Sequence, residues 1–117
     1  MAVPLTDLER EHYFTALELA LTTSGYVVLK ASSQQRLKDE LLDFGLTSKG
    51  LAQEMWANRE KVKKITETRP GYEEPYHFDF VFDVRGMKRK MYVETVLDMG
   101  QEPDDSVITI VNIHETT

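Results

Sequence analysis

Six polar side chains in the second half of the chain are of types that transfer protons or neutralise a phosphate. They are Lys63, Lys64, Arg69, Asp79, Tyr92 and His114. Metal-independent cleavage of RNA needs a base for the 2′-OH proton, cations for the charged phosphorane and an acid for the leaving 5′-oxygen. His114 can do either proton transfer near neutral pH. Lys64 and Arg69 can supply positive charge, and Tyr92 can stack on a base or donate its proton. A structural interpretation stays open, with His114 ending the last strand and Tyr92 at a sheet edge.

The basic residues of the chain are concentrated in two short segments, residues 59–69 and 85–90. These segments hold most of the 14 basic residues, although the net charge is −6. Such clustering can create a positive patch on an acidic protein. The residues expected to contact RNA there are Arg59, Lys61, Lys63, Arg69, Lys88 and Arg89. The alternative is that both segments are simply solvated connections.

Several other chemistries are excluded or not expected. The chain has no cysteine, which excludes disulfides, thiol catalysis and cysteine-bound zinc. Its six glycines do not have the spacing of a phosphate-binding loop. A metal site made by His12, His77 and His114 would require distant elements to converge. We therefore expect neither a metal nor a cofactor.

Length and hydropathy favour a small cytoplasmic protein. With 117 residues, the chain is long enough for one domain with its own core. The first ten residues lack the basic and apolar regions of a signal peptide. No stretch approaches the roughly 20 apolar residues that span a membrane.

The last third of the chain has the alternation of a β-sheet. Tyr76, Phe78, Phe80 and Phe82 alternate with mostly polar residues, which predicts one aromatic face and one polar face over residues 76–84. The pattern resumes at residues 90–97. Residues 106–114 are apolar on both faces, which is typical of an inner strand. A polar, acidic loop over residues 98–105 separates these last two strands.

The first half of the chain predicts helices. Thr6 and Glu9 have the spacing of a capping box, and the helix they begin should continue to about Thr23, before Gly25. A short apolar run over residues 26–29 is a strand or a buried connector. Ser32 and Gln35 predict a second capping box, for a helix with Leu37, Leu41, Leu42 and Phe44 that Gly45 ends. Thr47 or Ser48 should begin a third helix with Leu51, Met55 and Trp56, ending near Arg59 or continuing toward Ile65.

Several segments, in this order, resemble one known family. These are LLDFGLTSKGLAQEM (41–55), KVKKI (61–65) followed by HFDFVFDV (77–84), MYVETVL (91–97) and ITIVNIHE (108–115). Together they are similar to the MqsR-type (motility quorum-sensing regulator) branch of the RelE-like ribonuclease toxins. The resemblance covers about residues 31–115 and leaves residues 1–30 as a helical N-terminal extension.

The resemblance implies a function and a site. It implies a small RNA-cleaving toxin whose partners are RNA, including ribosome-bound message, and a cognate antitoxin. Lys64, Tyr92 and His114 match the family's catalytic positions, and Asp79 matches a polar strand residue. Glu94 stands where the family has a lysine, and a diverged relative without nuclease activity stays open.

The sequence therefore predicts an α+β fold, RelE-like, in which the N-terminal helices cover one face of a three- or four-stranded antiparallel sheet. Phe78, Phe80 and Phe82 should face those helices. Lys64, Arg69, Tyr92 and His114 should converge on an exposed concave surface, with the Tyr92 hydroxyl and the His114 ring within about 10 Å.

The alternative function is a non-enzymatic interaction domain of the inhibitor or immunity type. Such a domain would bind protein through a sheet edge and its acidic surface, which includes Glu102, Asp104 and Asp105. No membrane partner is expected, and the oligomeric state is left open.

Overall fold

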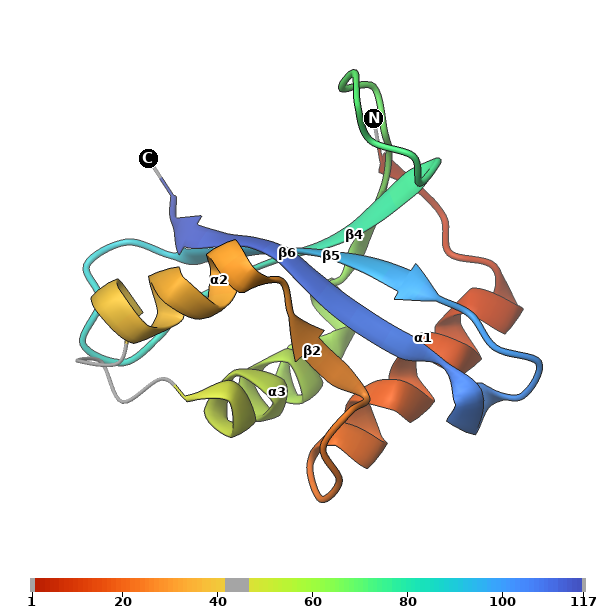
Figure 1. Cartoon of the computed structure of the whole chain (residues 1–117), viewed down its shortest axis with the longest axis horizontal. Helices are drawn as coiled ribbons and strands as arrows, with labels where there is room; N and C mark the ends of the chain where they lie inside the picture. The colour runs from red at the N-terminus through yellow and green to blue at the C-terminus, as the bar shows by residue number, and fades with distance from the viewer. Residues whose placement is uncertain (1, 42–46, 117) are drawn as a thin grey trace.

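The computed structural model of the chain describes residues 2–41 and 47–116, and Figure 1 shows how its elements are arranged. The α-helices are α1 (Asp7–Ala20), α2 (Ala31–Arg36) and α3 (Ser48–Ala57). The strands are β1 (Ala2–Val3), β2 (Val27–Leu29), β3 (Lys63–Thr66), β4 (Tyr76–Phe82), β5 (Met91–Asp98) and β6 (Val107–Glu115). A π-helical turn (Leu37–Leu41) and two 3₁₀ turns (Arg59–Lys61 and Pro103–Asp105) complete the described elements.

The described residues form an α+β fold around one six-stranded sheet. The strand order is β1-β3-β4-β5-β6-β2, and β2 runs parallel to β6 while the other neighbours are antiparallel. The α+β class is confirmed, but the prediction of three or four strands is wrong. Strands β1 and β2 have two and three residues, which is too short for an alternation to be recognised.

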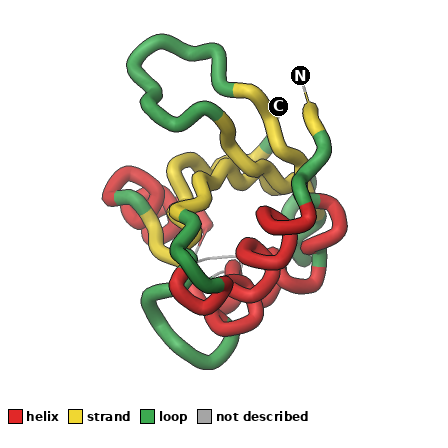
Figure 2. The backbone as a smooth tube through the Cα atoms, turned by 90° about the vertical axis from the view of Figure 1, so that its right-hand side faces the viewer, coloured by secondary structure: helices red, strands yellow, loops and turns green. Residues whose placement is uncertain are grey.

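Helices α1 and α3 cover one face of this sheet. Figures 1 and 2 show α1 and α3 below the strands, with the connection between β3 and β4 rising on the opposite side. The ring of Tyr13 on α1 lies 5.4 Å from the ring of Phe78 and 6.0 Å from that of Phe80. Phe80 and Phe82 are almost completely buried. The prediction that the aromatic row of β4 faces the helices is confirmed.

The beginning of α1 is as the sequence predicts, and its end comes earlier. Glu9 accepts the Thr6 backbone N–H at 2.9 Å, and Thr6 accepts the Glu9 N–H at 3.1 Å, which completes the capping box. The helix ends at Ala20, followed by turns up to Gly25, whose φ of +100° suits a glycine. Helix α1 and strands β1 and β2 make residues 2–29 part of the same sheet and core.

Helix α2 differs from the prediction. It begins at Ala31 with Lys30 as the N-cap and without a side-chain capping bond, so the Ser32–Gln35 capping box is wrong. The Lys30 N–H binds the Ile110 carbonyl at the end of the β2–β6 pairing, which makes the helix begin directly after β2. The predicted continuation through Leu42 and Phe44 to Gly45 lies outside the described residues.

Helix α3 begins as predicted and ends before the basic segment. The Thr47 hydroxyl accepts the Gly50 N–H at 3.0 Å. The helix stops at Ala57, and a 3₁₀ turn then leads into β3 at Lys63. The alternative in which this helix continues toward Ile65 is therefore wrong. Within the ranges that the structure describes, no helix is both long enough and apolar enough to cross a bilayer.

Candidate functional site

The face of the sheet opposite the helices carries most of the polar residues singled out by the sequence. Because side chains alternate between the faces of a strand, Lys63, Asp79 and Glu94 share this face and are cross-strand neighbours on β3, β4 and β5. Tyr92 and His114 are paired in the next row, on β5 and β6. We call this surface the open face.

Tyr92 and His114 form a stacked pair on the open face. Their ring centroids are 4.9 Å apart with an interplanar angle of 31°. The predicted proximity of the two side chains is confirmed. The Nδ1 of the exposed His114 lies 2.8 Å from the Glu115 carbonyl oxygen, so the neutral ring donates its Nδ1–H there and keeps its lone pair on Nε2.

Beside this pair, six side chains form a closed circuit of hydrogen bonds and ion pairs, which we call the polar ring. Its members are Glu67, Arg69, His77, Asp79, Tyr92 and Glu94. Arg69 connects the two glutamates. Its Nη1 and Nη2 donate to the two carboxylate oxygens of Glu94 at 3.1 and 2.6 Å, and its Nε and Nη2 donate to Glu67.

Tyr92 and His77 close the other half of the polar ring. The Tyr92 hydroxyl lies 2.8 Å from Asp79 Oδ2, to which it donates, and 3.2 Å from Glu94 Oε1. The other Asp79 oxygen lies 2.7 Å from His77 Nδ1, and His77 Nε2 is 3.6 Å from Glu67. The hydroxyl of Tyr92 is thus occupied within the protein, while its ring stacks on His114.

The polar ring shifts the pKa values of Asp79 and Glu94 in opposite directions. Burial raises the pKa of Asp79, which its hydrogen bonds with His77 and Tyr92 only partly offset. Burial also acts to raise the pKa of Glu94, but the hydrogen bonds and charge of Arg69 outweigh it and leave this pKa below its usual value. Burial and the nearby Asp79 carboxylate raise the pKa of the Tyr92 hydroxyl, which keeps it protonated.

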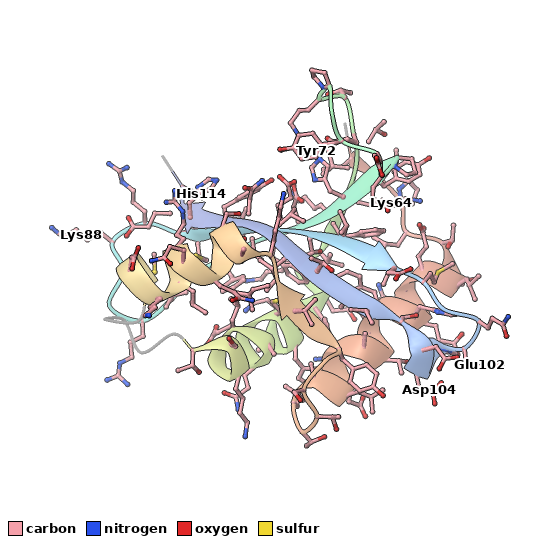
Figure 3. The ribbon with its side chains drawn as sticks, in the orientation of Figure 1. Lys64, Tyr72, Lys88, Glu102, Asp104 and His114 are labelled. Carbon is pink, nitrogen blue, oxygen red and sulfur yellow. The ribbon has the colours of Figure 1, made fainter. Side chains whose placement is uncertain are left out.

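Lys64 does not join this surface, so the predicted convergence is wrong for this residue. It is the partner of Phe78 in the β3–β4 register and therefore points to the helix-covered side. Its Nζ donates to Glu9 Oε1 at 2.8 Å and lies 4.1 Å from the centre of the Tyr76 ring. Figure 3 shows Lys64 far along the sheet from His114. Lys64 is thus held in an ion pair with α1, away from the stacked pair.

A groove of about 670 Å³ lies on the open face beside Tyr92. Its floor includes Ile65 and Val81, and the Val81 side chain is 42% exposed despite its position in a central strand. Three lysines line it: Lys61, Lys63 and Lys90. Within residues 2–41 and 47–116, no side chain of these three has a hydrogen-bond or ion-pair partner. The groove, which the carboxylates of Glu60 and Asp79 also line, therefore combines these lysines with apolar and aromatic side chains.

No family model, curated protein or solved structure matches this chain.

The other predicted RNA contacts lie in different surroundings. Lys88 and Arg89 are exposed in the connection between β4 and β5, and Figure 3 shows Lys88 at the same end of the sheet as His114. The Arg59 guanidinium stacks 4.0 Å from the centre of the Trp56 ring and donates to the Trp56 carbonyl. Arg69, in contrast, is bound by two carboxylates of the polar ring, those of Glu67 and Glu94.

One group in the described part of the chain has the spacing of a metal site. The ligand atoms of His77, Asp79 and Glu94 lie within 4.8 Å of one another. Both Glu94 oxygens are bound by Arg69, and His77 Nδ1 and both Asp79 oxygens also have partners. A cation would have to displace Arg69, so this arrangement fits an internal hydrogen-bond network better than a metal centre.

Sequence reasoning did not place Glu67, His77 and Glu94 in a common site. Glu94 shares strand parity with Tyr92, and His77 shares it with Asp79, so their common face could have been predicted. Glu67 of the polar ring lies just beyond the end of β3, where parity alone does not say which neighbours it meets. The closing of the ring by Arg69 depends on how residues 67–75 fold back over the sheet.

Proposed function

We propose that the protein is a diverged relative of the RelE-like ribonuclease toxins that binds single-stranded RNA across the open face and cleaves it without a metal. The observation that carries this proposal is the groove, in which three lysines without a partner among the described residues lie beside Tyr92, whose ring packs on that of His114. Its place of action would be the cytoplasm, and its protein partner a cognate antitoxin.

The groove has the two features that sequence-tolerant binding of single strands requires. Lysine ammonium groups neutralise successive phosphates, and aromatic rings stack on bases, with about 1–3 kcal/mol for each stacked base. Lys61 and Lys63 lie on the β3 side of the groove and Lys90 on the β5 side. A strand of RNA crossing β4 between them would place a base against Val81 or Tyr92.

His114 is the residue proposed to act as the base. Its exposed Nε2 accepts the 2′-OH proton, the 2′-oxygen attacks the phosphorus, and the bond from phosphorus to the 5′-oxygen breaks. The leaving oxygen takes its proton from the His114 imidazolium or from water. In this proposal Tyr92 stacks on a base rather than donating a proton, because its hydroxyl is bound to Asp79. Lys64 has a structural role.

Binding is tested by the anisotropy of a fluorescent single-stranded RNA at several salt concentrations. Lys63→Ala and Lys90→Ala should each weaken binding and reduce the slope of log K against log salt by about 0.7, the value for one phosphate contact on a single strand. Lys49→Ala is the matched control, because Lys49 is exposed on α3. Equal losses in all three variants would contradict the groove.

Cleavage is tested separately, with EDTA present. Wild-type protein should cleave the RNA, and His114→Ala should be at least about tenfold slower, in line with the loss of general base catalysis. If the two proteins cleave at the same rate, the activity is not that of this site. Binding with no cleavage would indicate a relative that kept the surface and lost the nuclease.

The second candidate is a non-enzymatic acidic interaction domain of the inhibitor or immunity type. It is favoured by the fact that Lys64 and Arg69 are both bound by carboxylates and cannot contact a phosphate as they stand. Induced expression distinguishes the two candidates. Wild-type protein should arrest growth of the host and His114→Ala should not, whereas normal growth with both, together with absent RNA binding, would favour the interaction domain.

A further inference from the structure

Arg69 lies beside Glu94, behind the groove residue Asp79, and each of its three guanidinium nitrogens already donates to a carboxylate. Its guanidinium binds Glu94 through two nitrogens and Glu67 through Nε and Nη2. The Tyr72 ring covers it at 4.0 Å from the guanidinium carbon. All three nitrogens are therefore occupied, although the Arg69 side chain is 38% exposed.

Arg69 binds Glu94 in the geometry with which a guanidinium binds a phosphate. A guanidinium presents two parallel N–H groups that match the two oxygens of either a carboxylate or a phosphate. Glu94 takes both positions, at 3.1 and 2.6 Å, and its side chain is only 3% exposed. Glu94 thus occupies the site on Arg69 that a phosphate of a bound nucleic acid would take.

Glu67 and Glu94 bind Arg69 from different parts of the fold. Glu67 belongs to the same connection as Arg69, residues 67–75, so their contact moves with that connection. Glu94 lies in the middle of β5 and fixes the connection to the sheet. Glu94 is also the cross-strand partner of Asp79, which lines the groove. A released Arg69 would therefore meet a phosphate at the edge of the same groove.

We propose that Glu94 is an internal phosphate mimic that withholds Arg69 from RNA and thereby sets the affinity of the open face. This inference rests on the proposed RNA-binding function. Exchange of Glu94 for a phosphate is unfavourable in the wild type, because it would leave a buried carboxylate without its cation. Removing the charge of Glu94 removes that obstacle. Glutamine has the same shape and can still accept a hydrogen bond from Tyr92.

The experiment compares binding of one labelled single-stranded RNA to four proteins. Glu94→Gln should bind about five- to tenfold more tightly than the wild type near 0.1 M salt, and its slope of log K against log salt should be steeper by about 0.7, as one added phosphate contact requires. Glu94→Gln combined with Arg69→Gln should return both values to those of the wild type. Glu102→Gln removes the same charge from an exposed loop and should change neither.

Each result supports or overturns the inference. A gain that persists when Arg69→Gln is added would mean that the gain does not come from Arg69, and a gain that Glu102→Gln reproduces would mean that only net charge matters. No gain in folded Glu94→Gln, checked by circular dichroism, would mean that Arg69 is not withheld. Failure of the proposed function looks different: wild-type binding would then be absent or unaffected by Lys63→Ala. The paired Glu94 and Arg69 variant has the wild-type net charge but leaves the Glu67 carboxylate without Arg69, so its folding is checked by circular dichroism in the same way.

Discussion

Replacing Lys64 by methionine tests whether this residue stabilises the fold or acts in catalysis. Its ammonium is 2.8 Å from Glu9 Oε1, and the two side chains are only 8% and 16% exposed. Breaking a buried ion pair from one side costs about 3–5 kcal/mol. Glu9 retains the Thr6 N–H and some solvent, so we expect a loss below that range, about 2 kcal/mol.

Urea unfolding followed by circular dichroism measures this loss. With an m value of about 1.5 kcal/mol/M for a chain of this size, Lys64→Met should lower the midpoint by about 1.3 M. Adding Glu9→Gln should restore part of it, because the uncompensated carboxylate is then gone. Lys63→Met is the matched control, since the adjacent Lys63 is exposed on the other face. It should change stability by less than about 0.5 kcal/mol and weaken RNA binding.

The opposite pattern would refute this reasoning. If Lys64→Met unfolds at the wild-type urea concentration and loses RNA cleavage to the extent of His114→Ala, Lys64 reaches the substrate. The catalytic role implied by the family resemblance would then be correct, and the ion pair with Glu9 would be incidental.

Three further predictions concern the polar ring and the connection that covers it. Tyr92→Phe should destabilise the protein by about 1–2 kcal/mol in urea unfolding, because Asp79 loses a hydrogen-bond donor. The affinity for RNA should stay within about twofold of the wild type. A large loss of affinity would mean that the Tyr92 hydroxyl contacts RNA. Stability should fall as the pH drops below 4.5, the ordinary pKa of a glutamate, because the pKa of Glu94 in the folded protein is lower than that. The stability that Glu94 contributes is present above pH 4.5 and is lost as the pH falls through the folded pKa. The raised pKa of Asp79 acts in the other direction, because its contribution to stability is present below its ordinary value of 3.8 and is lost as the pH rises through the folded pKa. Glu94→Gln lacks the Glu94 contribution, so its thermal unfolding from pH 3 to 7 should show a shallower loss of stability in acid. Identical profiles of wild type and Glu94→Gln would contradict the assignment. Gly71→Ala should cost about 1 kcal/mol without any steric clash, because Gly71 has a φ of +85° and nothing lies within 4 Å of an added Cβ; an unchanged urea midpoint would show that this turn adapts freely.

Local patterns in the sequence were sufficient for the long elements. The capping boxes and caps at Thr6 and Thr47 depend on residues three apart, and the strands at residues 76–82 and 91–98 depend on alternation along one segment. The face on which Tyr92 lies also follows from the alternation along its own strand. All of these features involve interactions close in sequence or between successive strands, and so the order of residues is enough to predict them.

Only the tertiary structure shows whether each basic residue is paired with a carboxylate or exposed to solvent. The sequence placed Lys63 and Lys64 together in one basic segment, and the strand that forms there sends the two to opposite faces of the sheet. Whether β3 begins at Lys63 depends on where α3 stops and on pairing with β4 and β1, which no local pattern fixes. The same holds for Arg69, whose charge is neutralised by Glu94, 25 positions away.

The sequence by itself therefore determined the α+β class, the main strands and the face on which Tyr92 lies, because periodicity and caps act over a few residues. Only the tertiary structure decided that Lys64 belongs to an ion pair with α1 and that Arg69 is bound within the polar ring. It also decided that three other lysines line a groove without a partner in the described part of the chain. The physical reason is that a charge is free or neutralised according to the groups within a few ångströms of it. In this chain those groups come from elements far apart in sequence.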